Sequence, residues 1–140
     1  MRVFSKILHA KLHRTFGTRS QRYQGKLRKT FLNGRIKILY DNRIIYEYID
    51  VLSRQEFGFH REAINDMIDF LKRDGEFINA EHLKIKCSDE ADKKFYEVYK
   101  FGDAQYLITG NKKHFPNEET IIIPKDFLQK YENWVYKHRN

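Results

Sequence analysis

The chain has 140 residues, of which 41% are hydrophobic and 33% are charged. This composition predicts one globular domain with its own core and excludes a disordered chain. The single cysteine, Cys87, excludes an intrachain disulfide and a zinc site made of several thiolates, and it favours a reducing compartment such as the cytoplasm. No hydrophobic stretch has the length of a membrane span or a signal peptide, so we expect no membrane attachment.

The net charge of +8 comes from one end of the chain. Residues 1–40 contain eleven Lys and Arg and no Asp or Glu, whereas residues 41–140 contain sixteen basic and nineteen acidic residues. A basic arm without acids can hold phosphate backbones without sequence preference, and an Arg-rich, acid-free start is also typical of a transit peptide. We therefore treat residues 1–30 as an atypical basic segment and residues 31–140 as the folded domain.

Residues 1–30 show only weak periodicity. Phe4, Leu8, Leu12 and Phe16 are spaced as on one face of a helix, and Gly17 interrupts the pattern. A parallel sheet needs an apolar central strand, and no convincing strand precedes Asn33.

From Phe31 onward, hydrophobic spacing predicts alternating strands and helices. The predicted strands cover residues 35–40, 77–80, 106–109 and 120–123. The first predicted helix begins at Asp41 or Asn42 with Ile44, Ile45, Tyr48, Val51 and Leu52 inward, and the second has Ile64, Met67, Ile68 and Leu71 inward and ends at Asp74-Gly75. The third covers residues 89–99 with Ala91, Phe95, Val98 and Tyr99 inward, and the last covers residues 125–136 after Pro124. This alternation predicts a three-layer α/β/α domain with a mainly parallel sheet.

Three predicted elements carry polar side chains that the fold could bring to one edge of the sheet. Glu47 lies beside the buried face of its helix, where a carboxylate is costly unless it is paired or binds metal. Pairing with Arg43 or Arg54 is the simpler interpretation of Glu47. Asn111 follows a buried strand and could orient a metal-bound water, although a turn role is equally typical of Asn.

Asp89 and Asp92 lie in the first turn of the third predicted helix. Acids in a first turn commonly cap a helix and complement its dipole, which is the simpler interpretation. Alternatively, Glu47, Asp92 and Asn111 form an oxygen-only site of the kind that Mg²⁺ or Mn²⁺ prefers. Lys112 and Lys113 would then contact an incoming polyanion, and His114 is expected at the surface.

Four segments resemble the PIN-domain family, and specifically its VapC-like toxin branch. They are IIYEYIDVLSRQEF, SDEADKKFYEV, YLITGNKKHFP and IIIPKDFL, within residues 31–131. The resemblance implies a nuclease that cuts RNA with Mg²⁺ or Mn²⁺, with Glu47 and Asp92 as metal-site carboxylates, Asp89 close by, and Asn111 at the last position of the acidic cluster. It also implies a cognate antitoxin and a homodimer as protein partners.

The resemblance fails at the start of the chain. The family opens with a strand that leads into a metal-binding Asp, whereas Ser5 and Lys6 stand at the corresponding place and no acid precedes Asp41. One interpretation is that residues 1–30 are read from a shifted frame. The chain is therefore expected to be an endoribonuclease, an inactivated relative, or a binding or organelle-targeted protein with a basic arm.

Overall fold

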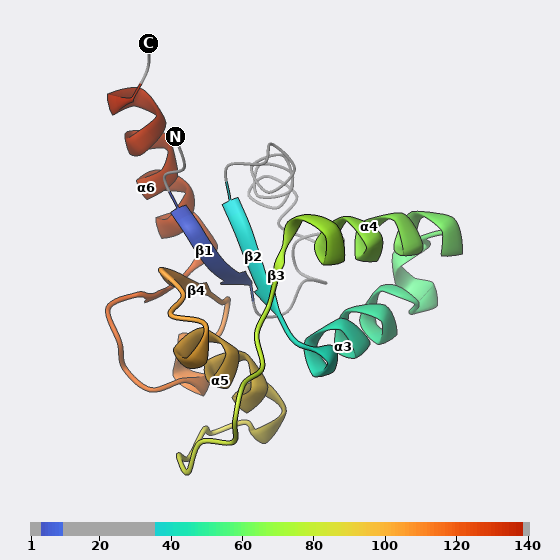
Figure 1. Ribbon diagram of the computed structural model, residues 1–140, viewed down its shortest axis with the longest axis horizontal. Coiled ribbons are helices and arrows are strands. Elements are labelled where there is room, and N and C mark those ends of the chain that lie inside the picture. Colours follow the sequence, from blue (N-terminus) through green and yellow to red (C-terminus); the bar gives the residue numbers. More distant parts are fainter. Residues whose placement is uncertain (1–3, 10–35, 139–140) are drawn as a thin grey trace.

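The computed structural model describes residues 4–9 and 36–138, and Figure 1 shows their arrangement. The strands are β1 (Phe4–His9), β2 (Ile36–Tyr40), β3 (Glu76–Phe77), β4 (Tyr106–Ile108) and β5 (Ile121–Ile122). The α-helices are α3 (Asn42–Leu52), α4 (Arg61–Asp74), α5 (Lys93–Phe101) and α6 (Pro124–Lys137). Three short 3-10 helices are η1 (Gln55–Phe57), η2 (Glu90–Asp92) and η3 (Lys112–His114).

The five strands form one sheet in the order β3-β2-β1-β4-β5, and every pairing between them is parallel. The centre of the sheet is β1, which pairs with β2 on one side and with β4 on the other. The expectation that no strand precedes Asn33 is therefore wrong. So is the helical interpretation of Phe4 and Leu8, because pairing with two neighbouring strands overrides a weak local preference. Leu12 and Phe16 lie outside the described residues.

The helices complete the predicted α/β architecture. The chain moves outward from β1 to β3 and then crosses back over the sheet to reach β4. The connection from β3 to β4 contains α5, which packs against β1, β2 and β4 and also contacts α3. Figure 1 shows α4 beside β2, and α5 beside β1 and β4, in agreement with their contacts. The prediction of a three-layer α/β/α domain with a parallel sheet is confirmed.

Hydrophobic spacing predicted the core well in the helices that flank β2 and β3. In α3, all five residues expected inward are buried, and Asp41 caps the helix by accepting a hydrogen bond from the Ile44 amide at 3.0 Å. In α4, Ile64, Ile68 and Leu71 are buried and Met67 is partly buried. Apart from Val51, these side chains form one core with those of β2, β4, β5 and α5.

The third predicted helix differs in its first turn. Residues 90–92 form the separate turn η2, and α5 begins at Lys93. Phe95, Val98 and Tyr99 are buried as expected, whereas Ala91 is exposed, because it belongs to η2 and not to the regular helix.

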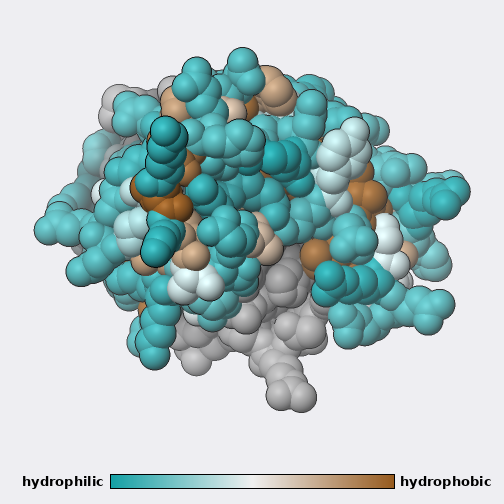
Figure 2. All heavy atoms as spheres, turned by 90° about the horizontal axis from the view of Figure 1, so that it is seen from below, coloured by the Kyte–Doolittle hydropathy of each residue, from teal (hydrophilic) through white to brown (hydrophobic). Residues whose placement is uncertain are grey.

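The face of the molecule drawn in Figure 2 is mainly polar. On the face drawn in Figure 2, hydrophobic residues occur only in small, separate clusters within a hydrophilic surround. In the described part of the chain, no helix combines the length and the apolar character that crossing a membrane requires.

Candidate metal centre

Asp92 is a deeply buried carboxylate near the end of β4. It is the last residue of η2, and its side chain is 4% exposed. A carboxylate that has lost its water must be compensated by hydrogen bonds or by positive charge. One such contact comes from His114, whose Nδ1 lies 2.7 Å from Asp92 Oδ2. Burial together with a directed polar contact makes Asp92 the anchor of the candidate site.

Asp89 holds the turn that carries Asp92 and also faces the same histidine. Its Oδ1 accepts a hydrogen bond from the Ala91 amide at 2.9 Å, so Asp89 caps η2 as the first-turn position predicted. Its Oδ2 lies 3.8 Å from His114 Nδ1. Capping and site formation are therefore compatible, since each uses a different oxygen of one carboxylate.

His114 reaches the two aspartates from the segment that follows β4. Thr109 is buried at the end of this strand, and its Oγ1 accepts a hydrogen bond from the Asn111 amide at 3.0 Å. The Asn111 carbonyl in turn accepts a hydrogen bond from the His114 amide at 3.0 Å, within the turn η3. The Ser88 hydroxyl donates to the Lys113 carbonyl at 3.0 Å, which ties η3 to the residue preceding Asp89.

The donor atoms of Asp89, Asp92 and His114 all lie within 4.8 Å of one another. Two ligand atoms about 2.1 Å from one divalent ion and at right angles to each other are about 3.0 Å apart. The separations of 2.7 Å and 3.8 Å from His114 Nδ1 bracket this value, so the three side chains fit an ion after small movements. Two carboxylates and one imidazole are suitable ligands for a divalent metal.

Sequence reasoning placed Asp89 and Asp92 at this edge but expected His114 at the surface. The signal for His114 was its position just after a buried strand, together with the turn residues Gly110 and Asn111. Its partner Asp92 is 22 positions earlier in the chain, and spacing within one element cannot reveal such a pairing.

Glu47 lies on α3 and contacts a lysine. Its Oε1 is 2.7 Å from Nζ of Lys94, and its side chain is 26% exposed. The expected partners Arg43 and Arg54 contact other carboxylates instead. Glu47 is not a member of the three-residue cluster, so its role as a metal ligand stays a prediction.

Asn111 contributes backbone contacts that shape the turn, as its position after a strand predicted. The role of its side chain in orienting water stays a prediction. Lys112 and Lys113 follow it in η3, and both are exposed. Within the described residues, neither lysine forms an ion pair, so both are available to an anion that approaches His114.

A second polar network, which the sequence reasoning missed, lies at the same edge of the sheet. Arg43 joins two carboxylates from different elements: its Nε donates to Asp41 Oδ2 at 2.8 Å, and its Nη1 donates to Glu97 Oε1 at 2.7 Å. Arg43 Nη2 also lies 2.7 Å from Asp41 Oδ2, without hydrogen-bond geometry. The network ties the start of α3 to α5.

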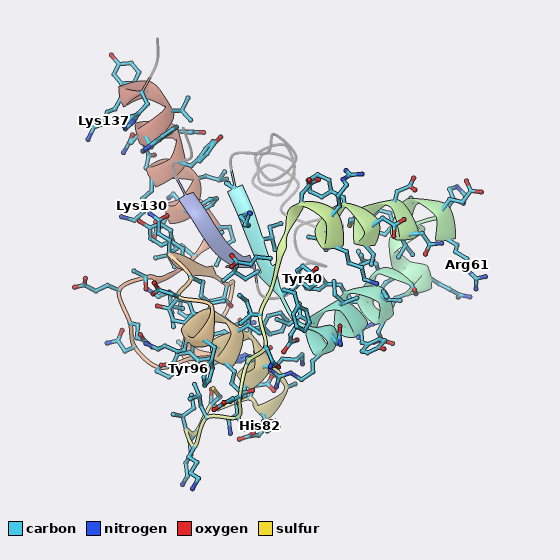
Figure 3. All side chains as sticks on the ribbon, in the orientation of Figure 1. Tyr40, Arg61, His82, Tyr96, Lys130 and Lys137 are labelled. Carbon is cyan, nitrogen blue, oxygen red and sulfur yellow. The ribbon has the colours of Figure 1, made fainter. Side chains whose placement is uncertain are left out.

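Glu97 is 1% exposed, although it is an acid in the middle of a helix. Its Oε2 accepts a hydrogen bond from the Leu83 amide at 2.7 Å and lies 3.5 Å from His82 Nδ1. Figure 3 shows His82 on the segment after β3, next to α5. Burial alone would raise the pKa of Glu97, but the hydrogen bonds from Arg43 and Leu83 and the charge of Arg43 lower this pKa below its ordinary value.

One comparison with known proteins identifies a family. The sequence model of the PIN domain matches residues 12–113, which is more than half of the chain. The match includes Glu47, Asp89, Asp92 and Asn111, and it ends one residue before His114. It begins at residue 12 rather than 31, so it covers part of the basic segment. No curated protein and no solved structure matches the chain significantly.

Proposed function

Because the chain belongs to the PIN-domain family, we propose that it is a divalent-metal-dependent endoribonuclease that hydrolyses RNA phosphodiester bonds. The PIN domain is a nuclease fold whose members generally use divalent metals and bind nucleic acid. The observation that carries the proposal is the buried Asp92 with Asp89 and His114 beside it, at an edge of the sheet where parallel strands end.

Each residue at this edge has a role in the proposal. Asp92 and Asp89 would hold the ion, with Glu47 as a further carboxylate if Lys94 moves away from it. Once bound, a divalent ion would activate water and offset the charge of the phosphate being displaced. Asn111 would orient that water, and the exposed Lys112 and Lys113 would hold the RNA backbone as point charges.

The more specific role is that of a toxin paired with an antitoxin. It is supported by the likeness of IIYEYIDVLSRQEF and YLITGNKKHFP to the toxin branch of the family. An antitoxin protein, and a second copy of the chain as dimer partner, belong to this part of the proposal. A cytoplasmic location would agree with the single buried thiol, Cys87.

Asp92→Asn tests the proposed function. The substitution keeps the size of the side chain and removes its negative charge. We expect cleavage of a mixed-sequence RNA by the unaltered chain with Mg²⁺ or Mn²⁺, no cleavage with chelator, and a loss of about 100-fold or more in Asp92→Asn. The matched control is Asp69→Asn, which removes a similar charge from an exposed position on α4.

The result also distinguishes a second candidate function, a nucleic-acid-binding protein without catalytic activity. Two sequence observations favour this candidate: the basic residues concentrated in positions 1–40, and the absence of any acid before Asp41. RNA binding that weakens steeply as salt is raised, with no metal-dependent cutting by the folded chain, would establish the binder and exclude the nuclease.

A further inference from the structure

We propose that His114 is a metal ligand and that its imidazole makes the site prefer Zn²⁺ and similar transition ions over Mg²⁺. This inference rests on the proposed function only in requiring that the site of Asp89 and Asp92 binds a divalent ion. The family match ends at residue 113, so it assigns no role to His114.

The position of the ring carries the first step. His114 Nδ1 is 2.7 Å from Asp92 Oδ2 and 3.8 Å from Asp89 Oδ2, so one ring nitrogen faces both carboxylates. An ion held by the two aspartates would lie next to this nitrogen. The histidine would then bind through a deprotonated Nδ1, with its proton on Nε2.

The backbone around His114 is also hydrogen-bonded, which distinguishes it from a histidine on an untethered surface loop. Its turn is fixed by the bond from the His114 amide to the Asn111 carbonyl and by the bond from Ser88 to the Lys113 carbonyl. The histidine side chain is 31% exposed. The backbone of the turn is thus held both within η3 and by Ser88. Because the side chain is partly exposed, solvent can still reach the site.

A third ligand is needed because the central strand supplies no acid. In the parallel sheet, β1 ends at His9, which pairs with Ile108 at the end of β4. Ser5 and Lys6, expected at the end of this strand, lie within it, and the sequence places no Asp or Glu before Asp41. Within the described residues, the segment that follows β4 supplies His114, which reaches both aspartates.

The donor chemistry then sets the choice of ion. Mg²⁺ is a hard ion that prefers oxygen ligands and keeps much of its water, whereas imidazole nitrogen suits Zn²⁺ and other late first-row ions. Two carboxylates and one imidazole would give three protein ligands, the number found in zinc centres that keep a position open for water. We therefore expect Zn²⁺ to bind more tightly than Mg²⁺ by at least a factor of ten.

The test measures metal binding directly, without an RNA substrate. Zn²⁺ and Mg²⁺ are titrated by calorimetry into the unaltered chain, His114→Ala and His114→Asn, with His60→Ala as a control at an exposed histidine. We expect both His114 variants to lose at least tenfold in Zn²⁺ affinity and less than threefold in Mg²⁺ affinity, while His60→Ala changes neither. Asn can still donate a hydrogen bond to Asp92, so its loss of Zn²⁺ affinity would come from the missing imidazole.

A second measurement uses the unaltered protein and so does not depend on whether a variant folds. On addition of Zn²⁺, the ¹⁵N resonance of His114 Nδ1 should shift to the range of a metal-bound nitrogen. An unshifted resonance, or equal Zn²⁺ affinity with and without the imidazole, would overturn the inference while leaving a nuclease that uses other ligands. Zn²⁺ bound through His114 in a chain that cuts no RNA would uphold the inference and overturn the proposed function.

Discussion

Gly75 ends α4 at a point where the backbone of the helix meets β2. A Cβ placed on this residue would lie 2.4 Å from the Leu71 carbonyl oxygen and 2.7 Å from the Ile38 carbonyl oxygen. Its φ of −83° is accessible to any residue, so space and not conformation excludes a side chain here. Because both neighbours are backbone atoms, relief would require α4 to move away from the sheet.

We expect Gly75→Ala to lower the free energy of unfolding by about 1–3 kcal/mol, as overpacking typically does. Gly58→Ala is the informative comparison, because Gly58 has open space around its Cβ position but a φ of +64°. Its cost should come from backbone strain alone, about 1–2 kcal/mol. Urea unfolding of the three proteins measures both effects, and a Gly75→Ala protein as stable as the parent would show that α4 and β2 are not in close contact.

Among single residues, those of the candidate metal centre show what the local sequence can and cannot identify. Asp89 and Asp92 could be identified because a helix start constrains residues near each other in the chain. His114 could not, because its importance depends on a contact 22 positions away that only the folded chain creates. The predicted partner of Glu47 was wrong for the same reason, since Lys94 lies in α5, whereas Arg43 and Arg54 are both close to Glu47 in the chain.

At the scale of elements, the Asp41–Arg43–Glu97 network joins α3 to α5 where β2 ends. Asp41 and Glu97 are buried, and the side chain of Arg43 is 37% exposed. One cation therefore compensates two carboxylates that have lost most of their water. Such a network holds elements in one arrangement, because removing a single member leaves an uncompensated buried charge.

Glu97→Gln should destabilise the protein at neutral pH and change its response to acid. The expected loss of unfolding free energy is about 3 kcal/mol, at the low end for breaking a buried pair. It is at the low end because Arg43 keeps its ion pair with Asp41 and its partial contact with solvent. The lowered pKa of Glu97 means that its contribution is complete above the ordinary value of 4.5 and is lost as pH falls through the folded-state value. The parent should therefore lose more stability than Glu97→Gln as pH falls below about 4.5.

Urea unfolding at several pH values measures this difference. The control is Glu81→Gln, which neutralises an exposed carboxylate on the segment after β3. Its stability should follow that of the parent at every pH. If Glu97→Gln lost stability in acid in parallel with the parent, protonation of Glu97 would not be the cause of the acid destabilisation. Glu118, whose pKa is also lowered beside Lys100, would then be the next candidate.

Helices were more predictable from the sequence than strands in this chain. The helices α3, α4 and α6 each bury one stripe of hydrophobic side chains, and the spacing of such a stripe is visible within the sequence of the helix itself. The strand β1 has no comparable local signal, because a central parallel strand is specified by the strands on both sides of it. Its neighbours β2 and β4 are separated from it in the chain by many residues, so local periodicity could not identify it.

At the scale of the whole molecule, β1 determines whether residues 31–140 are a domain by themselves. Ile7 pairs with Ile38 of β2 and with Tyr106 of β4, so β1 links the two halves of the sheet. Removing it would leave the facing backbone groups of β2 and β4 without partners, next to fully buried residues such as Leu39 and Leu107. Each unpaired buried backbone group is costly, and a strand contains several.

We therefore expect a fragment of residues 31–140 to lack a cooperative unfolding transition, whereas a fragment of residues 1–138 keeps that of the full chain. Circular dichroism and urea unfolding measure cooperativity, and hydrogen exchange at the backbone amides of β2 and β4 shows whether the sheet is intact. A cooperative 31–140 fragment with protected amides would establish the domain boundary expected from the charge pattern. It would also mean that β2 and β4 can pair without β1, and residues 1–30 would then act only as a basic arm.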